Sequence, residues 1–353
     1  MRRLLALFLT LLLLTPLTAV ADQTITLTFT GDVTLGGEDR TRAEATSFDS
    51  VYDREGGSYF LKHMADFFAQ DDLTIINLEG VISDSNAFEA TNKYFRFRAP
   101  TKMVDILTSS SVEVCSMANN HSYDFGKFGY KTTQDTLAAA GIGYFGSKNV
   151  YVYEKGNVKI AFLSLNTTEY YSNRSWYRQE IPRLRSEEGV DFVVFCFHVG
   201  SEYSARHIYR QEEYSQHAID AGADLIIMHH PHVVQGMEVY NNRYVFYSLG
   251  NFCFGGNNRV DVEREGKWFS ARECLVVRAE LTFSDEGEYL GQQMKLYPAY
   301  TSGTAPENNY QPVMADEAGV KVVMDRLQYD TAWTVPAYDA EKGYAQTEYL
   351  PAQ

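Results

Sequence analysis

The segment 229–232 carries three histidines and a proline directly after the apolar run 223–227. Imidazoles at the end of a β-strand add little stability, but neutral imidazole is the commonest protein ligand for zinc, manganese and iron. His230 and His232 are two residues apart, so an extended backbone would place both rings on the same side of the chain. Taken alone, the motif fits a metal site and a solvated turn equally well.

Other predicted strands end on side chains with the same chemistry. Strands are expected over 24–30, 73–76, 112–117, 158–165, 191–197 and 244–249 from their apolar and β-branched residues. The polar residues at or beyond these strand ends are Asp32, Asn77, Glu79, Asn120, His121, His198 and Asn251. Carboxylates, carboxamides and imidazoles together suit a borderline divalent metal such as manganese, zinc or iron.

Helical spacing of apolar residues alternates with these strands, at 60–68, 103–107, 131–140 and 209–222. This alternation predicts an α/β fold with a mostly parallel or mixed sheet and helices outside it. Polar side chains at the carboxyl ends of such strands meet at one edge of the sheet. Residues 22–303 form the predicted domain, and 304–353 are expected as a C-terminal helical or irregular appendage with one helix over 314–327. The aromatic segment around Trp176 and Tyr177 is expected to pack as a loop.

The first 21 residues have the layout of a secretory signal peptide. They begin with two arginines, continue as a leucine-rich segment and end in Ala19-Val20-Ala21. An uncleaved membrane anchor is the alternative, although the apolar segment is short for a span. We therefore expect an exported protein that works in the periplasm or on the outer face of the cytoplasmic membrane or cell surface.

Charge and cysteine content narrow the class of partner. The formal net charge is −15, from 31 basic and 46 acidic residues in a chain of 353. Nucleic acid and anionic lipid are disfavoured as main partners, because both require a basic surface. Four cysteines do not make a disulfide-dense scaffold. Cys253 and Cys274 form the one pair considered for a bridge, and free thiols are favoured over it.

Eight short motifs occur in an order that resembles a known family. They lie at 29–33, 77–80, 97–100, 118–121, 140–146, 198–203, 230–235 and 248–252. Together they make residues 26–254 similar to the CapA, or poly-γ-glutamate capsule synthesis, family. That resemblance implies a calcineurin-like metallophosphoesterase fold, a layered β-sheet sandwich flanked by helices.

The resemblance also implies roles for individual residues. Two divalent metal ions (Mn, Zn or Fe) would be held by Asp32, Glu79, Asn120, His198, His230 and His232. Glu79 would take the position of a bridging aspartate, and a metal-bound hydroxide would be the nucleophile. His121 would protonate the leaving group.

The first motif departs from the metallophosphoesterase pattern. These proteins generally begin with Asp-x-His, whereas here Thr34 stands in the histidine position after Asp32. Glutamate also replaces the usual bridging aspartate. One ion is therefore expected to be held more weakly than the other.

Lys93, Arg96 and Arg98 form a basic island in an acidic chain. Alternation would send Arg96 and Arg98 to one face of a strand. They form either a charged edge strand or a clamp for an anionic substrate, because guanidinium pairs with carboxylate or phosphate in a fork geometry. Asn251 is grouped with the two arginines as a candidate substrate contact.

The leading functional hypothesis is an exported metal-dependent hydrolase of capsule or cell-envelope polymer metabolism. By resemblance the polymer is poly-γ-glutamate, and the role is its synthesis, export or trimming. A non-catalytic polymer-binding or assembly subunit of a membrane capsule-synthesis machine is the first alternative. A general extracytoplasmic phosphatase is the second.

Overall fold

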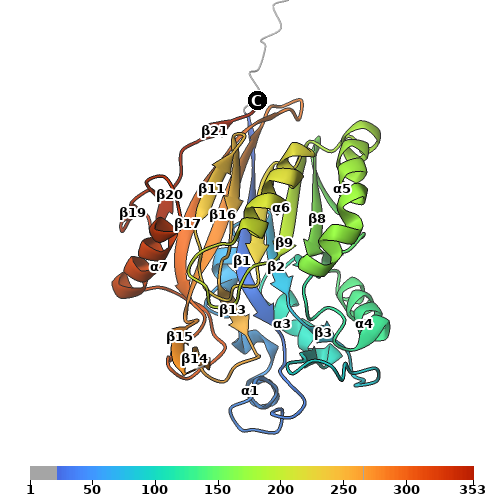
Figure 1. The fold of residues 1–353 in the computed structure, drawn as a ribbon, viewed down its shortest axis with the longest axis vertical. Helices are drawn as coiled ribbons and strands as arrows, with labels where there is room; N and C mark the ends of the chain where they lie inside the picture. Colours follow the sequence, from blue (N-terminus) through green and yellow to red (C-terminus); the bar gives the residue numbers. More distant parts are fainter. Residues whose placement is uncertain (1–21, 265) are drawn as a thin grey trace, which may run out of the picture.

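The computed structural model describes residues 22–264 and 266–353, and it contains two facing β-sheets with helices on both outer sides (Figure 1). The predicted signal segment 1–21 lies outside the described residues. The first sheet has the order β19 (Tyr338–Asp339), β20 (Tyr344–Gln346), β17 (Tyr289–Tyr300), β16 (Glu273–Phe283), β1 (Gln23–Thr34), β2 (Leu73–Leu78), β5 (Val114–Ser116) and β6 (Gly143–Phe145). In addition, β13 (Asn251–Phe254) pairs with β1, while β18 (Val313–Met314) and β21 (Leu350–Pro351) pair with β17.

The second sheet is smaller. Its order is β11 (Met237–Tyr240), β12 (Arg243–Phe246), β10 (Leu225–His229), β9 (Phe192–His198), β8 (Val158–Asn166) and β7 (Tyr151–Lys155). Two further strand pairs are β14 (Asp261–Arg264) with β15 (Lys267–Ser270) and β3 (Val81–Ile82) with β4 (Arg98–Ala99).

Helices cover the outer faces of both sheets. Those that pack on the first sheet are α1 (Phe48–Glu55), α2 (Ala65–Phe68), α3 (Asp105–Thr108) and α4 (Gly126–Ala139), together with the 3₁₀ turns η1 (Gly57–Tyr59) and η2 (Thr101–Val104). The second sheet is covered by α5 (Thr167–Glu188) and α6 (Tyr209–Asp220). The last helix, α7 (Glu317–Tyr329), packs near β16 and β17. The predicted layered α/β sandwich is confirmed.

The sequence of β9 explains why two layers can cover one strand. Successive side chains point to opposite faces of a strand. Phe192, Val194 and Cys196 lie in the core between the two sheets, whereas the alternate residues lie in the core under α5 and α6. A strand buried on both faces must be apolar throughout, as this one is until His198.

Two local predictions are wrong. The segment around Trp176 is the helix α5, not a loop; Tyr170, Tyr177 and Leu184 are buried on its inner face. Its start is fixed by a capping box between Asn166 and Glu169. The predicted helix over 60–68 forms only the four residues of α2, after a series of turns.

The segment 304–353 contributes to the main core. Val323 and Leu327 of α7, and Ala345 of β20, are buried in the same cluster as β1, β9 and β10. The predicted helix over 314–327 appears as α7.

All four cysteines are free and buried, so Cys253 and Cys274 are not bonded to each other. No helix within the described residues is long and apolar enough to cross a membrane.

We expect Leu327→Ala to lower the free energy of unfolding by about 2–5 kcal/mol, because it removes a fully buried side chain. Urea unfolding measures the change. Lys321→Ala on the same helix is the control, since that side chain is 74% exposed, and we expect a change within about 0.5 kcal/mol. A loss below about 1 kcal/mol for Leu327→Ala would show that α7 adds little to the core.

A second prediction concerns His207, which joins α6 to the segment after α7. Its Nδ1 lies 2.9 Å from Asp330 Oδ2, and its Nε2 lies 2.9 Å from Glu212 Oε1. Partial burial lowers the pKa of His207, but these two carboxylates outweigh it and raise the pKa above the ordinary value. The stabilisation is complete below the unfolded-state pKa of about 6.5 and is lost as pH rises through the folded-state pKa. The difference in unfolding free energy between wild type and His207→Asn should therefore be larger at pH 6 than at pH 9. An equal difference at both pH values would contradict this ion pair.

Candidate metal centre

Parallel pairing brings the polar strand ends together. In the first sheet, β1 pairs in parallel with β2 and β13, which aligns Asp32 with Asn77 on one side and Asn251 on the other. In the second sheet, β9 and β10 are also parallel, which aligns His198 with His229. The loop after β10 carries His230 and His232. The candidate site therefore lies where the two sheets meet at their carboxyl ends.

Asp32 is the buried centre of this cluster. It accepts a hydrogen bond from Asn77 Nδ2 at 2.8 Å, and its Oδ2 lies 3.2 Å from His232 Nδ1. His198 Nδ1 lies 4.0 Å from Oδ1. Burial raises the pKa of Asp32, but the hydrogen bond with His232 and the neighbouring imidazoles outweigh it, so the pKa falls below its ordinary value. Asp32 is therefore an ionised ligand candidate.

Glu79, directly after β2, has an unusual environment. Its carboxylate is fully buried, and neither oxygen has a hydrogen-bond partner among the described residues. His198 Nε2 and His121 Nε2 lie 3.6 Å and 3.8 Å from Oε1. Burial and the charge of Asp32 raise the pKa of Glu79 well above its ordinary value. Leaving a buried carboxylate unsatisfied is costly, and coordination to a cation would remove that cost. The residues present therefore fit a metal ion.

The histidine loop does not have the predicted extended backbone. His230 has φ 102° and His232 has φ 60°, both in a region that side chains with a Cβ seldom adopt. Such backbone strain is found at functional sites. The two turns still bring both rings to the same space, with centroids 5.9 Å apart. His230 Nδ1 also lies 3.1 Å from His198 Nε2.

Burial and mutual repulsion keep two of these imidazoles neutral. Burial, followed by the charge of His230, lowers the pKa of His198 well below its ordinary value. Burial and His232 lower the pKa of His230 to about 4. For His232 burial also lowers the pKa, but the carboxylates of Glu79 and Asp32 outweigh it and raise the pKa to about 10. The charged His232 ring therefore balances the two carboxylates, and a bound cation would displace its proton.

His121 sits at the edge of the cluster with a partner that the sequence analysis missed. Its Nδ1 lies 2.6 Å from Oδ2 of Asp124, which is fully buried. Asp124 also accepts from Phe97 N at 2.8 Å and binds Lys93 Nζ. Lys93 Nζ donates to Asn120 O at 2.6 Å. Burial lowers the pKa of His121 even though the contact with Asp124 raises it. The spacing His121-x-x-Asp124 was the available signal for this pair.

Three other candidate residues stand apart from the cluster. Asn120 is exposed, and its carboxamide makes no hydrogen bond with any described residue. Arg96 pairs with Glu89 at 2.7 Å, and Arg98 pairs with Asp39 at 2.9 Å. Arg98 is also nearly buried and donates to Ser83 O at 2.8 Å. Both guanidinium groups are therefore engaged by carboxylates of the chain itself.

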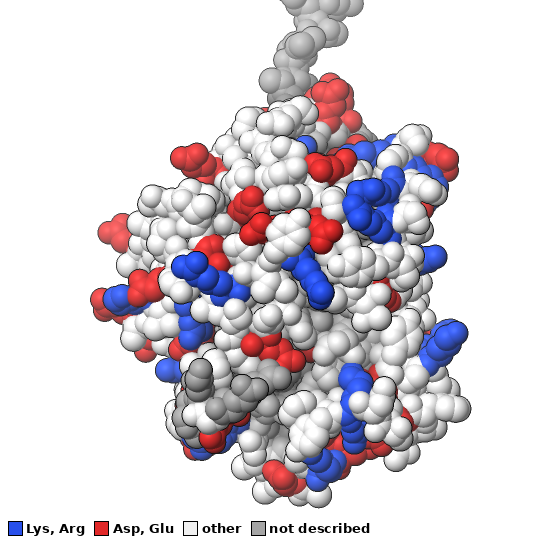
Figure 2. Space-filling view, in the orientation of Figure 1, with Lys and Arg blue, Asp and Glu red and all other residues white. Residues whose placement is uncertain are grey.

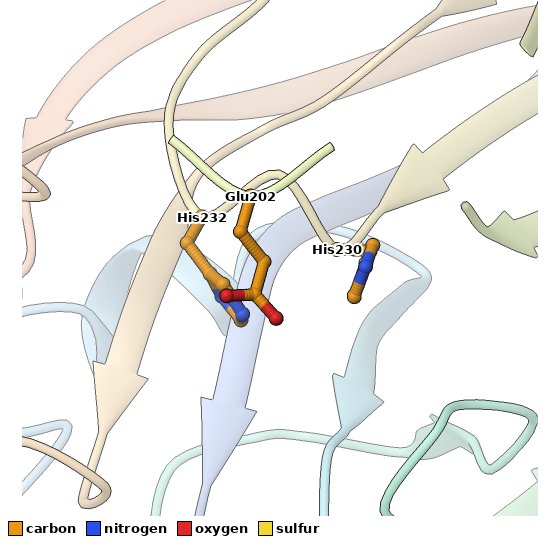
Figure 3. Close-up of side chains that lie close together, drawn as sticks. All are labelled: Glu202, His230 and His232. Carbon is orange, nitrogen blue, oxygen red and sulfur yellow. The ribbon is translucent and has the colours of Figure 1, made fainter. Parts of the chain in front are cut away.

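Seven of the predicted residues do come together. They are Asp32, Glu79, His121, His198, His230, His232 and Asn251, whose Oδ1 lies 2.8 Å from His232 Nδ1. Two groups have ligand atoms mutually within 4.8 Å: Asp32 with Glu79 and His232, and Glu202 with His230 and His232 (Figure 3). Glu202 lay inside a motif of the sequence analysis but was given no role.

Two facing sheets with carboxylates and imidazoles at their parallel strand ends define a metallophosphoesterase-like protein. The sequence model of the bacterial capsule synthesis protein family PGA_cap matches residues 26–256. The chain belongs to this family, and the resemblance found in the sequence is confirmed.

Individual relatives agree with this assignment. The chain is 25% identical over 337 residues to the PGA biosynthesis protein CapA of Bacillus subtilis (strain 168), covering 89% of this chain and 81% of that protein. It is 27% identical over 257 residues to the capsule biosynthesis protein CapA of Bacillus anthracis, covering 66% of this chain and 60% of that protein. A hypothetical protein from Thermus thermophilus has a similar structure at 15% identity and TM-score 0.43, covering 78% of this chain and 99% of that chain. The family is one of capsule and polyglutamate synthesis accessory proteins.

The unsatisfied carboxylate of Glu79 generates a prediction about stability. In EDTA, we expect Glu79→Gln to unfold at the same temperature as wild type or higher, because the variant no longer buries an ionisable group. Added Mn²⁺ should raise the unfolding temperature of wild type, and that of the variant much less. Scanning calorimetry measures both shifts. Glu113→Gln, in which Glu113 accepts from Thr74 N at 2.7 Å, is the control and should keep the full shift. Equal shifts in wild type and Glu79→Gln would contradict a metal-binding role for Glu79.

Proposed function

We propose that this protein is an exported metal-dependent hydrolase that trims an anionic envelope polymer, with poly-γ-glutamate as its substrate. The observation that carries the proposal is the fully buried, unsatisfied carboxylate of Glu79, which lies 3.8 Å from the imidazole of His121. One group calls for a cation, and the other can move a proton. The names of the relatives support the polymer, and the layout of residues 1–21 supports export.

Five residues would hold two divalent cations (Mn, Zn or Fe): Asp32, Glu79, His198, His230 and His232. Asn120 would join them only after its exposed carboxamide turned inward. When bound, such ions supply Lewis-acid polarisation of the scissile bond and a nucleophilic water of lowered pKa. The chain's own residues then position the substrate and handle its protons.

His121 is the proton donor in this proposal. Asp124 accepts from Nδ1, which fixes the ring orientation and leaves Nε2 to face the reacting centre. In the imidazolium form, Nε2 carries the proton that passes to the departing nitrogen or oxygen. Burial lowers the pKa of His121 and makes that imidazolium a stronger acid. Lys93, bound to Asp124, keeps the carboxylate in place.

A polyanion must approach an acidic protein. Acidic and basic side chains are interspersed on the face seen in Figure 2. Lys93, whose side chain is 30% exposed beside His121, can meet a carboxylate of the substrate. The polymer would have to displace Glu89 or Asp39 to reach Arg96 or Arg98, while Asn251 lies inside the site. We therefore expect polymer binding to weaken as salt increases.

We expect His121→Ala to slow polymer cleavage about 10²–10⁴-fold, the usual contribution of a general acid. Poly-γ-glutamate is incubated with Mn²⁺-loaded protein, and its chain length is followed by size-exclusion chromatography. His63→Ala removes an exposed imidazole outside the site and should leave the rate unchanged. Equal rates for wild type and His121→Ala would contradict the assigned role.

Thr34, in place of a histidine ligand, favours a second candidate function. In that case the protein is a polymer-binding or assembly subunit of a membrane capsule machine and does not cleave the polymer. Retention of poly-γ-glutamate without any shortening would support this candidate. Cleavage of p-nitrophenyl phosphate, with the polymer left intact, would instead indicate an extracytoplasmic phosphatase.

A further inference from the structure

Glu202 brings a carboxylate to the histidine loop from a separate element. It lies four residues beyond His198, in the connection between β9 and α6. One of its carboxylate oxygens, one nitrogen of His230 and one nitrogen of His232 lie within 4.8 Å of one another. Figure 3 shows the Glu202 carboxylate beside the His232 ring, with the His230 ring facing the same space.

The orientation of His232 decides which of its nitrogens can serve there. Nδ1 already lies 2.8 Å from Asn251 Oδ1 and 3.2 Å from Asp32 Oδ2. A ring whose Nδ1–H is held by acceptors offers the lone pair of Nε2 to a metal. Asn251 and Asp32 thus orient the ring from behind, as second partners of metal-binding histidines do.

The distances suit one ion after small side-chain movements. Zinc–nitrogen and zinc–carboxylate bonds are about 2.0–2.2 Å long, so two ligand atoms of one ion lie at most about 4.4 Å apart. The upper limit of 4.8 Å in this cluster is close to that value. Two imidazoles and one carboxylate form a known catalytic zinc set that leaves a coordination position open.

Thr34 shows why a further ligand is needed. It stands where the first motif would otherwise carry a histidine, and its buried hydroxyl has no hydrogen-bond partner among the described residues. No imidazole can reach the site from that position. The carboxylate of Glu202 is a ligand that arrives from the opposite sheet.

We propose that Glu202, His230 and His232 hold one divalent cation, with Glu202 as the ligand that replaces the histidine absent at position 34. This inference rests on the proposed function, because the second ion of that function is held by Asp32, Glu79 and His198. Glu202 is exposed, so the ion that it binds exchanges with solvent more readily than the buried one. A carboxylate and two imidazoles select zinc or manganese.

The test is a Zn²⁺ titration by calorimetry of the EDTA-treated chain, with metal content measured after gel filtration. Wild type should bind two ions of unequal affinity. Glu202→Gln should weaken the weaker ion at least about tenfold and leave the tighter one unchanged. Glu202→Asp keeps a carboxylate and should recover part of the affinity. Glu212→Gln is the control, because Glu212 pairs with His207 outside the site.

The outcomes separate this inference from the proposed function. Glu202→Gln with unchanged affinities overturns the role of Glu202 and leaves the hydrolase proposal standing. Loss of both ions in Glu202→Gln, in a variant that unfolds at the wild-type temperature in EDTA, also overturns the separate site. A wild-type chain that binds no Zn²⁺ overturns both proposals.

Discussion

The structure depends on the cost of burying two carboxylates side by side. Asp32 and Glu79 are both fully buried, and an unpaired charge in such a position costs several kcal/mol or forces a pKa shift. Imidazoles surround them, and His232 in its charged form lies close to both carboxylates. A cluster of this composition does not improve the core, since apolar residues of similar size would pack there at lower cost. Its retention is explained by cation binding.

The two-sheet architecture makes this cluster possible. Each sheet alone presents only part of it: the carboxylates come from the first sheet, and His198, His230 and His232 come from the second. Parallel pairing of β1 with β2, and of β9 with β10, sends all of these strand ends to one side. The apolar core between the sheets then holds the two halves in register.

The sequence predicted the parts of the site that depend on strands. Apolar alternation located β1, β9 and β10, and the residues at their ends followed from the position of each strand end. It could not predict the left-handed turns at His230 and His232, because tertiary contacts impose such strain. Asp124 and Glu202 were missed because each lies in a loop, where spacing carries little information about position. The helix α5 was missed because its polar, aromatic sequence favours no single local structure, and packing on β8 and β9 decides it.

The most direct test of the account is the metal content of the purified chain, with wild type beside His232→Ala, after growth with manganese, zinc and iron supplied. The account predicts close to two equivalents of divalent metal in wild type and a clear loss in the variant, because His232 contacts both ligand groups. The absence of metal from both proteins would contradict it, and the buried carboxylates would then need another explanation.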